Sequence, residues 1–240
     1  MDVTSGRAPG TMELVALGDS LTEGVGDPHG RRLHGWIHHL TQPPAPWRLS
    51  ANLARTGARA AHVRREQLAT AVALAPAVAT CVVGVNDVLD RRFDAGRFAV
   101  EYEALVGGLR EAAHVGVLAM TLHDLSEGLP LTRRARTSLR SRTAAANKVI
   151  EEVAGAHGAW LLEAREAVAF RGAGMLSVDR LHPNRRGHRY LAACAAEVLR
   201  GEGRVQHTAG PPAADPLGLR LRATGGHLRW LARHLAGSPR

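Results

Sequence analysis

The chain has 240 residues, of which 45% are hydrophobic, enough to bury one sizeable core and so to form a single α/β domain with tails. Its 31 lysine and arginine residues outnumber 22 aspartate and glutamate residues, for a formal net charge of +9, and Lys148 is the only lysine. So strong a preference for arginine is as typical of a coding bias as of an anionic partner, and the charge alone does not indicate a nucleic-acid-binding protein.

The N-terminal part of the chain places a short apolar run before a group of polar residues. Residues 1–11 contain no continuous apolar stretch, so we expect a flexible N-terminus rather than a secretory signal. The run 14–17 has strand length, and Asp19 and Ser20 follow it closely. A hydroxyl here lies just past the carboxyl end of a strand, where open α/β sheets bind ligands. The alternative is an ordinary turn in which Asp19 or Ser20 caps the next helix.

Strand-like and helix-like stretches alternate along the rest of the chain. Prolines end the first two predicted helices, and an uncharged run rich in β-branched residues follows the second. The predicted strands are 14–17, 47–53, 80–85, 115–120 and 159–164, and the predicted helices are 33–40, 58–74, 97–113, 132–157 and 185–200. This alternation predicts a parallel sheet covered on both faces, a three-layer α/β/α sandwich with right-handed crossovers.

Two cysteines and one apolar stretch bear on where the protein works. Cys81 and Cys194 lie in apolar surroundings, so we expect buried free thiols and a cytoplasmic location. The stretch 69–85 is uncharged, but it contains Pro76 and is shorter than the roughly 18 to 20 apolar residues that a spanning helix needs. We therefore predict no membrane span.

Arginines gather in two of the predicted helices. No aromatic side chains alternate with them, so they are more typical of solvated helix faces than of a nucleic-acid site. The residues are Arg133, Arg134, Arg136, Arg140 and Arg142 in one helix, and Arg185, Arg186 and Arg189 in the other.

The composition changes beyond the last predicted helix. Residues 201–216 are rich in glycine and proline and are predicted to be a linker. Residues 217–240 place leucines at helical spacing with arginines on another face, which predicts a basic amphipathic helix or tail. This helix either docks on its own domain or makes a peripheral contact with an anionic membrane surface.

The carboxyl ends of parallel strands meet at one edge of the sheet, so the polar residues that follow them are expected to converge. A serine nucleophile needs a base, a partner that orients the base, and donors for the oxyanion. Ser20 is the candidate nucleophile, His182 the base and Asp179 the orienting acid. The oxyanion donors are the backbone N–H groups of Ser20 and Gly57 and the side-chain amide of Asn86.

These residues stand in four sequence blocks that together resemble the SGNH, or GDSL, hydrolase family. The blocks are Gly18 to Leu21, Gly57, Gly84 to Asp87, and Asp179 to His182. The resemblance covers residues 12–200, the expected hydrolase domain. It implies a flavodoxin-like sandwich with strand order 2-1-3-4-5, and a serine esterase or lipase that needs no metal and no cofactor. It assigns the same roles to the five residues named above.

Other residues near the same strand ends are candidates for substrate binding. They are Asp19, Asp87 and His123. His123 and Asp124 also form a second pair of a histidine and an acid, which we expect to shape the pocket rather than to supply the base. Arg55 precedes Gly57 and either favours an anionic substrate or points outward.

The leading hypothesis is a serine hydrolase that cleaves a small-molecule carboxylic ester through an acyl-enzyme, of the esterase, lipase or acetylesterase type. The alternative is a non-catalytic protein that binds a ligand on the same scaffold and docks on a membrane through residues 217–240.

Overall fold

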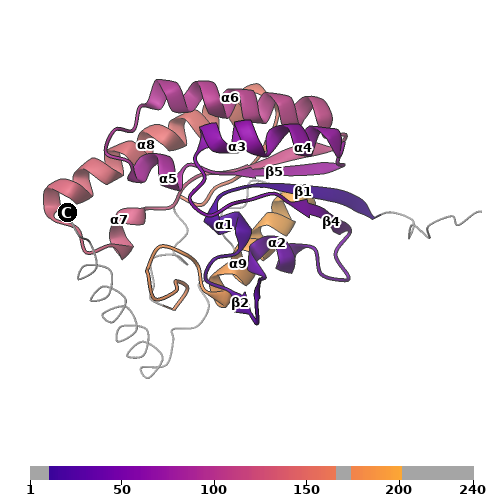
Figure 1. Cartoon of the computed structure of the whole chain (residues 1–240), viewed down its shortest axis with the longest axis horizontal. Helices are drawn as coiled ribbons and strands as arrows, with labels where there is room; N and C mark the ends of the chain where they lie inside the picture. The colour runs from indigo at the N-terminus through magenta and orange to yellow at the C-terminus, as the bar shows by residue number, and fades with distance from the viewer. Residues whose placement is uncertain (1–10, 166–173, 202–240) are drawn as a thin grey trace, which may run out of the picture.

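The computed structural model describes residues 11–165 and 174–201, so the predicted linker beyond residue 201 and the predicted tail helix lie outside the described residues. A five-stranded parallel sheet runs in the order β4-β1-β5-β6-β7 (Figure 1). Its strands are β1 (Met12–Gly18), β4 (Trp47–Asn52), β5 (Val78–Val82), β6 (Gly116–Met120) and β7 (Trp160–Leu162). Counted in chain order within this sheet, the arrangement is 2-1-3-4-5, as predicted.

Helices cover both faces of the sheet, which makes the three-layer sandwich that the sequence predicts (Figure 1). Helices α3, α4, α6 and α8 lie on one face, and α2 and α9 lie on the other. The helices are α1 (Ser20–Glu23), α2 (Gly35–Leu40), α3 (Ala60–Glu66), α4 (Leu68–Ala73), α5 (Val85–Leu89), α6 (Ala95–Ala112), α7 (Leu125–Gly128), α8 (Arg133–Ala156) and α9 (Arg185–Leu199). A short hairpin pairs β2 (Pro28–His29) with β3 (Arg32–Leu33).

The apolar run of β1 serves two cores, because neighbouring side chains of a strand point to opposite faces. Val15 and Leu17 pack with the cluster under α6 and α8, whereas Leu14 and Ala16 pack with the cluster under α2 and α9. All four side chains are fully buried, which explains a strand without polar alternation.

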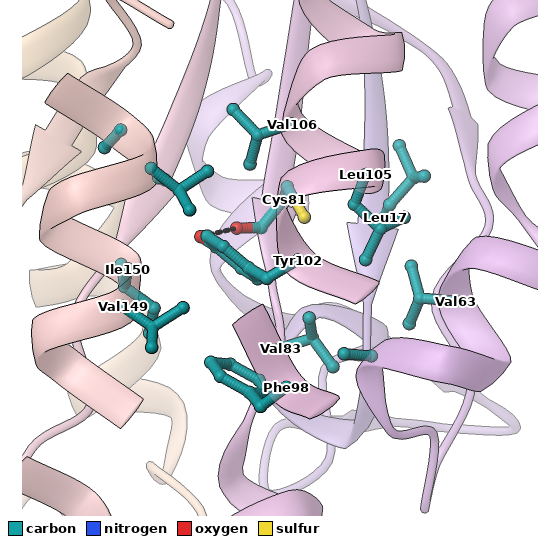
Figure 2. Packing of buried hydrophobic residues seen from close by; sticks show 14 of the residues in the cluster. Leu17, Val63, Cys81, Val83, Phe98, Tyr102, Leu105, Val106, Val149 and Ile150 are labelled. Atoms are coloured by element: carbon teal, nitrogen blue, oxygen red, sulfur yellow. Dashed lines mark hydrogen bonds between the residues drawn. The ribbon is translucent and has the colours of Figure 1, made fainter. Parts of the chain in front are cut away.

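The core under α6 and α8 is built around two stacked rings (Figure 2). The rings of Phe98 and Tyr102 lie 5.4 Å apart, and the Tyr102 hydroxyl donates to the carbonyl oxygen of Cys81 at 3.5 Å. Burial raises the pKa of the Cys81 thiol to about 12 and that of Cys194 to about 11. Both cysteines are buried thiols that form no disulfide with a described residue, as the sequence predicts.

Some element boundaries differ from the prediction for local reasons. The predicted helix 58–74 is interrupted at Gln67, which separates α3 from α4. The predicted strand 80–85 is wrong by two to three residues, because Gly84 has a φ of +136° and Val85 already begins α5. The β2–β3 hairpin and the short helix α7 were not predicted. Within the described ranges no helix is long and apolar enough to cross a membrane.

Two buried carboxamides hold the ends of two strands. The Gln67 side chain accepts from the N–H of Gly18 at 2.9 Å and donates to its carbonyl oxygen at 3.0 Å. Asn147 makes the same pair of bonds with Leu122, at 2.7 and 2.8 Å. Both amides are buried, so each satisfies two backbone groups that no water reaches. They fix the main chain immediately before Asp19 and before His123.

We expect the substitution Gln67→Leu to lower the free energy of unfolding by about 1 to 3 kcal/mol, because it leaves the buried N–H of Gly18 unsatisfied. The Gly18 carbonyl oxygen loses the Gln67 bond but still accepts from the Arg55 N–H at 3.2 Å. Urea unfolding of the purified protein measures the loss. Gln42→Leu, at an exposed glutamine, is the matched control and should change stability by no more than about 0.5 kcal/mol. Equal losses in the two variants would contradict this role of Gln67.

Candidate active site

Four segments that follow strands of the sheet bring the predicted residues to its carboxyl edge. Ser20 begins α1 directly after β1, and Gly57 lies in the loop after β4. Asn86 lies in α5, after β5, and the segment 174–184 carries Asp179 and His182 before α9. Segments far apart in sequence therefore meet at one place.

Ser20, His182 and Asp179 form a continuous chain of hydrogen bonds. The Ser20 Oγ lies 2.7 Å from His182 Nε2, and His182 Nδ1 lies 2.7 Å from Asp179 Oδ2. Because a carboxylate only accepts, Nδ1 carries the proton, and Nε2 accepts from the serine hydroxyl; this tautomer is assigned from the hydrogen-bond network. The histidine is thus oriented to receive a proton from Ser20.

The Asp179 carboxylate is held ionised by its own turn. Burial opposes the charge, but hydrogen bonds from the His182 side chain and from the backbone N–H groups of His182 and Leu181, together with the Ser177 hydroxyl, outweigh it and hold the pKa of Asp179 well below its ordinary value. The Asp179 Oδ1 accepts from Ser177 Oγ at 2.7 Å and from the two N–H groups at 2.9 and 3.0 Å. This leaves Oδ2 for the imidazole.

The segment that carries His182 folds back on itself and packs closely against the loop after α1. Ser177 N–H donates to the His182 carbonyl at 2.8 Å, and Asn184 caps α9 through the N–H groups of Arg186 and Gly187. A Cβ on Gly26, whose φ is +103°, would lie 1.9 Å from the Pro183 carbonyl oxygen, so only glycine fits this approach. Sequence reasoning missed Gly26, although the pair of glycines on either side of Val25 marks a tight turn.

The predicted oxyanion donors lie in segments that follow β1, β4 and β5 at the carboxyl edge of the sheet. Ser20 is the first residue of α1, so its N–H has no acceptor within the helix. Gly57 is exposed in a turn with a φ of +80°, and no atom lies within 4 Å of where its Cβ would be. Asn86 Nδ2 donates one hydrogen to the Ala58 carbonyl at 3.0 Å, which orients the amide and leaves its second hydrogen for another acceptor.

Two contacts join α1 to the end of β4 and to the Gly57 loop that follows it. The Glu23 carboxylate accepts from the Thr56 N–H at 2.6 Å, and Asn52 Nδ2 donates to the Thr22 carbonyl at 2.8 Å. These bonds hold the loop in register with Ser20. Arg55 is exposed, and its guanidinium donates to the Ala54 carbonyl at 3.1 Å.

Asp19 is buried beneath the site, with 1% of its surface exposed. Its Oδ1 caps α1 by accepting from the Leu21 N–H at 3.0 Å, while its buried Oδ2 has no hydrogen-bond partner among the described residues. Burial raises the pKa of this carboxyl to about 7, although the capping bond and the nearby His182 oppose the change. The carboxyl next to Ser20 therefore changes charge near neutral pH.

The other two substrate-binding candidates, Asp87 and His123, follow β5 and β6. The Asp87 carboxylate accepts from the Ala60 N–H at 3.2 Å, and burial raises its pKa. His123 is buried, which lowers its pKa to about 4, so the ring is neutral at pH 7. Its neighbour Asp124 is engaged elsewhere, by Arg140 at 2.8 Å and by the Ser126 N–H at 2.9 Å. Ser20 is bonded to His182 and not to this second pair.

No cluster of three or more histidine, cysteine, aspartate or glutamate side chains in the described part of the chain is arranged to hold a metal ion.

The fold, with its sheet order and its helices on both faces, is that of the SGNH hydrolases. The sequence model of the GDSL-like lipase/acylhydrolase family matches residues 16–190, and the chain belongs to this family.

Several solved structures share the fold over most of both chains. An acetylxylan esterase from Geobacillus stearothermophilus gives a TM-score of 0.64 at 18% identity, over 82% of this chain and 98% of the other. An alpha/beta hydrolase enzyme from the metagenome of Lake Arreo, Spain, gives 0.62 at 20%, over 79% and 95%. The acetyl xylan esterase AlAXEase gives 0.62 at 20%, over 78% and 100%. At these identities the likeness shows the fold alone, and a search among curated proteins found no significant match.

Structures of the Geobacillus stearothermophilus esterase include two catalytic mutants. One replaces an aspartate by alanine, and the other replaces a histidine three positions later in that chain.

The raised pKa of Asp19 predicts a pH-dependent stability. The folded state holds this proton more tightly than the unfolded chain, where the carboxyl has its ordinary pKa of 3.8, so the contribution of Asp19 is fully present below about pH 4 and is lost as the pH rises through about 7. Relative to the unaltered chain, Asp19→Asn should therefore gain stability between pH 4 and pH 7, by up to about 4 kcal/mol, because a tenfold change in proton affinity is worth about 1.36 kcal/mol.

Thermal or urea unfolding at each pH measures this difference. Asp94→Asn, which alters an exposed capping carboxylate at the start of α6, is the matched control. A difference between Asp19→Asn and the unaltered chain that stays constant or shrinks from pH 4 to pH 7 would refute the assignment.

Proposed function

We propose that the protein is a serine hydrolase that cleaves carboxylic esters of small molecules through an acyl-enzyme. The observation that carries the proposal is the chain of two 2.7 Å contacts from Ser20 through His182 to Asp179. A serine hydroxyl is a weak nucleophile until a base accepts its proton, and this arrangement supplies an oriented base.

In the first half of the reaction Ser20 Oγ attacks the ester carbonyl while His182 Nε2 takes the hydroxyl proton. Asp179 stabilises the imidazolium through Nδ1–H and keeps its own negative charge, consistent with a pKa held well below its ordinary value. The tetrahedral intermediate collapses, His182 returns the proton to the leaving alcohol, and the acyl group stays on Ser20. In the second half a water molecule repeats the attack in the same way and releases the carboxylic acid.

The negative charge on the carbonyl oxygen is stabilised by the N–H groups of Ser20 and Gly57 and the second amide hydrogen of Asn86. Removing one donor of this kind typically costs about 2.7 to 4 kcal/mol of transition-state stabilisation. All three donors are fixed before substrate binds: Ser20 by the start of α1, Asn86 by its bond to Ala58, and Gly57 by the contacts of its loop with α1. Such preorganisation is what makes an oxyanion site effective.

The comparisons support the reaction class. The family is one of lipases and acylhydrolases, and two of the similar structures are esterases that act on acetylated xylan. The catalytic aspartate and histidine of the Geobacillus enzyme have the same spacing as Asp179 and His182. His123 and Asp87 are proposed to border the bound substrate: burial lowers the pKa of His123 to about 4, so its ring is neutral, and burial raises the pKa of Asp87.

The substitutions Ser20→Ala and His182→Ala should each reduce the hydrolysis of p-nitrophenyl acetate by at least about 10³-fold, because nucleophile and base act as one unit. Circular dichroism and thermal unfolding check that the variants stay folded. His114→Ala, at an exposed histidine, is the control and should keep full activity.

A fluorophosphonate probe separates an enzyme from a protein that only binds ligands on this scaffold. Covalent attachment at Ser20 is expected in the unaltered chain and in His114→Ala. Full activity of Ser20→Ala, or the absence of labelling at Ser20, would remove the proposed nucleophile.

The substitution Asp179→Asn should lower kcat by about 10⁴-fold with little change in fold, because an amide in this place favours the wrong imidazole tautomer. Ser177→Ala is the graded comparison: it removes one bond to Oδ1 and leaves the Oδ2 contact with His182 intact, so its loss should stay within about tenfold. Steady-state kinetics with p-nitrophenyl acetate measure both variants. The assignment fails if Ser177→Ala loses as much activity as Asp179→Asn.

A further inference from the structure

Two adjoining surface grooves lead from the proposed oxyanion residues toward α8. The first has a volume of about 530 Å³ and is lined by Gly57 and Asn86. The second has a volume of about 790 Å³ and lies against the first turns of α8. Arg91, in the loop between α5 and α6, lines both grooves and so makes them continuous. Helices α5 and α8, which contribute residues to the two grooves, pack side by side (Figure 1).

The lining of these grooves is strongly basic. The residues that line them include six arginines and one acidic residue, Asp90. We call this surface the arginine groove; its arginines are Arg59, Arg91, Arg92, Arg133, Arg134 and Arg142.

The partners of these arginines leave most of the charge uncompensated. Arg59 pairs with Asp90 at 2.7 Å, and Arg142 Nε donates to the Val88 carbonyl at 2.6 Å. The other four guanidinium groups form no ion pair with any described residue, and they are exposed. By contrast, the neighbouring groove of about 780 Å³ beside α6 includes several carboxylates, among them Asp87, Asp94 and Glu101.

The N-terminus of α8 adds to the electrostatic repulsion among these arginines. A helix N-terminus carries a partial positive charge and is normally accompanied by acidic side chains. The first turn of α8 has no acidic residue and instead begins with Arg133 and Arg134, followed closely by Arg136. Like charges at this place destabilise the helix, and a bound anion would relieve the repulsion.

We propose that the arginine groove binds a phosphate group carried by the ester substrate, so that this site cleaves esters of phosphorylated small molecules in preference to neutral ones. The inference rests on the proposed function, because the groove begins at the two oxyanion residues Gly57 and Asn86. Arginine is the side chain best suited to phosphate, since its planar guanidinium donates two parallel hydrogen bonds and stays charged. Hydroxyls of Thr137, Ser138 and Ser141 in the same groove supply further donors.

Matched pairs of esters test the proposal. The pairs are 1-acetylglycerol with 1-acetylglycerol 3-phosphate, and an acetylated glucose with its phosphorylated counterpart, so that the ester stays the same and only the phosphate differs. For at least one pair, kcat/KM should be about tenfold or more higher for the phosphorylated ester at low salt, and the preference should shrink in about 0.5 M NaCl, where the Debye length falls below about 5 Å.

The double variant Arg91→Gln with Arg134→Gln should lose most of this preference, because it removes two of the unpaired charges. Arg189→Gln, an exposed arginine on α9 outside the groove, is the control and should keep it. No preference in either pair, while Ser20-dependent hydrolysis continues, would overturn the groove proposal and leave the hydrolase assignment standing.

A binding measurement covers the case in which neither ester is hydrolysed. Calorimetric titration of the full-length Ser20→Ala protein should show saturable binding of the phosphorylated esters, at least about tenfold weaker in the Arg91→Gln, Arg134→Gln background. Inorganic phosphate is titrated in parallel. Binding of free phosphate with no gain from the attached ester, or no binding at all, would overturn the proposal whatever the fate of the hydrolase assignment.

Discussion

The hydrogen bond between Ser20 and His182 joins residues that are 162 positions apart, and most of the structure around the site serves to make it form. β1 lies between β4 and β5 in the sheet, and Ser20 follows just beyond its carboxyl end. The segment 174–184, before α9, brings His182 to the same edge of the sheet. The close approach of Gly26 to Pro183 fixes how near this segment lies to the loop after α1. A hydrogen bond of 2.7 Å tolerates little displacement, so β1 and the segment before α9 must both be held in place for it to form.

Two buried polar side chains hold the main chain beside the site. Gln67 fixes Gly18, one residue before Asp19, and Asn147 fixes Leu122, one residue before His123. An amide that bonds both the N–H and the carbonyl of a buried residue resists displacement, because losing it leaves at least the buried N–H without an acceptor. The site is therefore anchored by side chains that never meet the substrate.

The alternation of strands and helices and the candidate site residues can be inferred from the sequence, because they depend on local composition and on the rule that parallel strands end at one edge. The sheet order is predicted from the resemblance to the SGNH hydrolases and not from composition. The two interpretations of Asp19 and Ser20 turn out to apply together: Asp19 caps α1, and Ser20 faces His182. Gln67 could not be found in this way, since a glutamine within a helical stretch looks like any surface residue. Its partner lies 49 positions away, and only the packing of α3 and α4 on the sheet brings them together.

The arginine groove also could not be predicted from the sequence, because it too depends on residues that are distant in the chain. Arg133 and Arg134 are typical of a solvated helix face when α8 is considered alone, and they are indeed exposed. What the sequence does not reveal is that Arg91, from a loop more than one helix away, continues their surface to Gly57 and Asn86. A charged face becomes a candidate binding surface only through its position relative to the site.

Charge is distributed unevenly along this edge of the sheet, and the distribution suits an ester with a remote anionic group. Near Ser20 the side-chain charge is reduced: burial raises the pKa of Asp19 to about 7, burial lowers that of His123 to about 4, and hydrogen bonds satisfy the Asp179 carboxylate. The uncompensated positive charge of the arginine groove extends from Gly57 and Asn86 toward α8. A full charge beside the reacting carbonyl would disturb the proton transfer between Ser20 and His182, whereas charges farther along the groove attract and orient an anion over about 8 Å at physiological ionic strength. Recognition by charge and catalysis by hydrogen bonding can then occupy neighbouring parts of one surface without interfering.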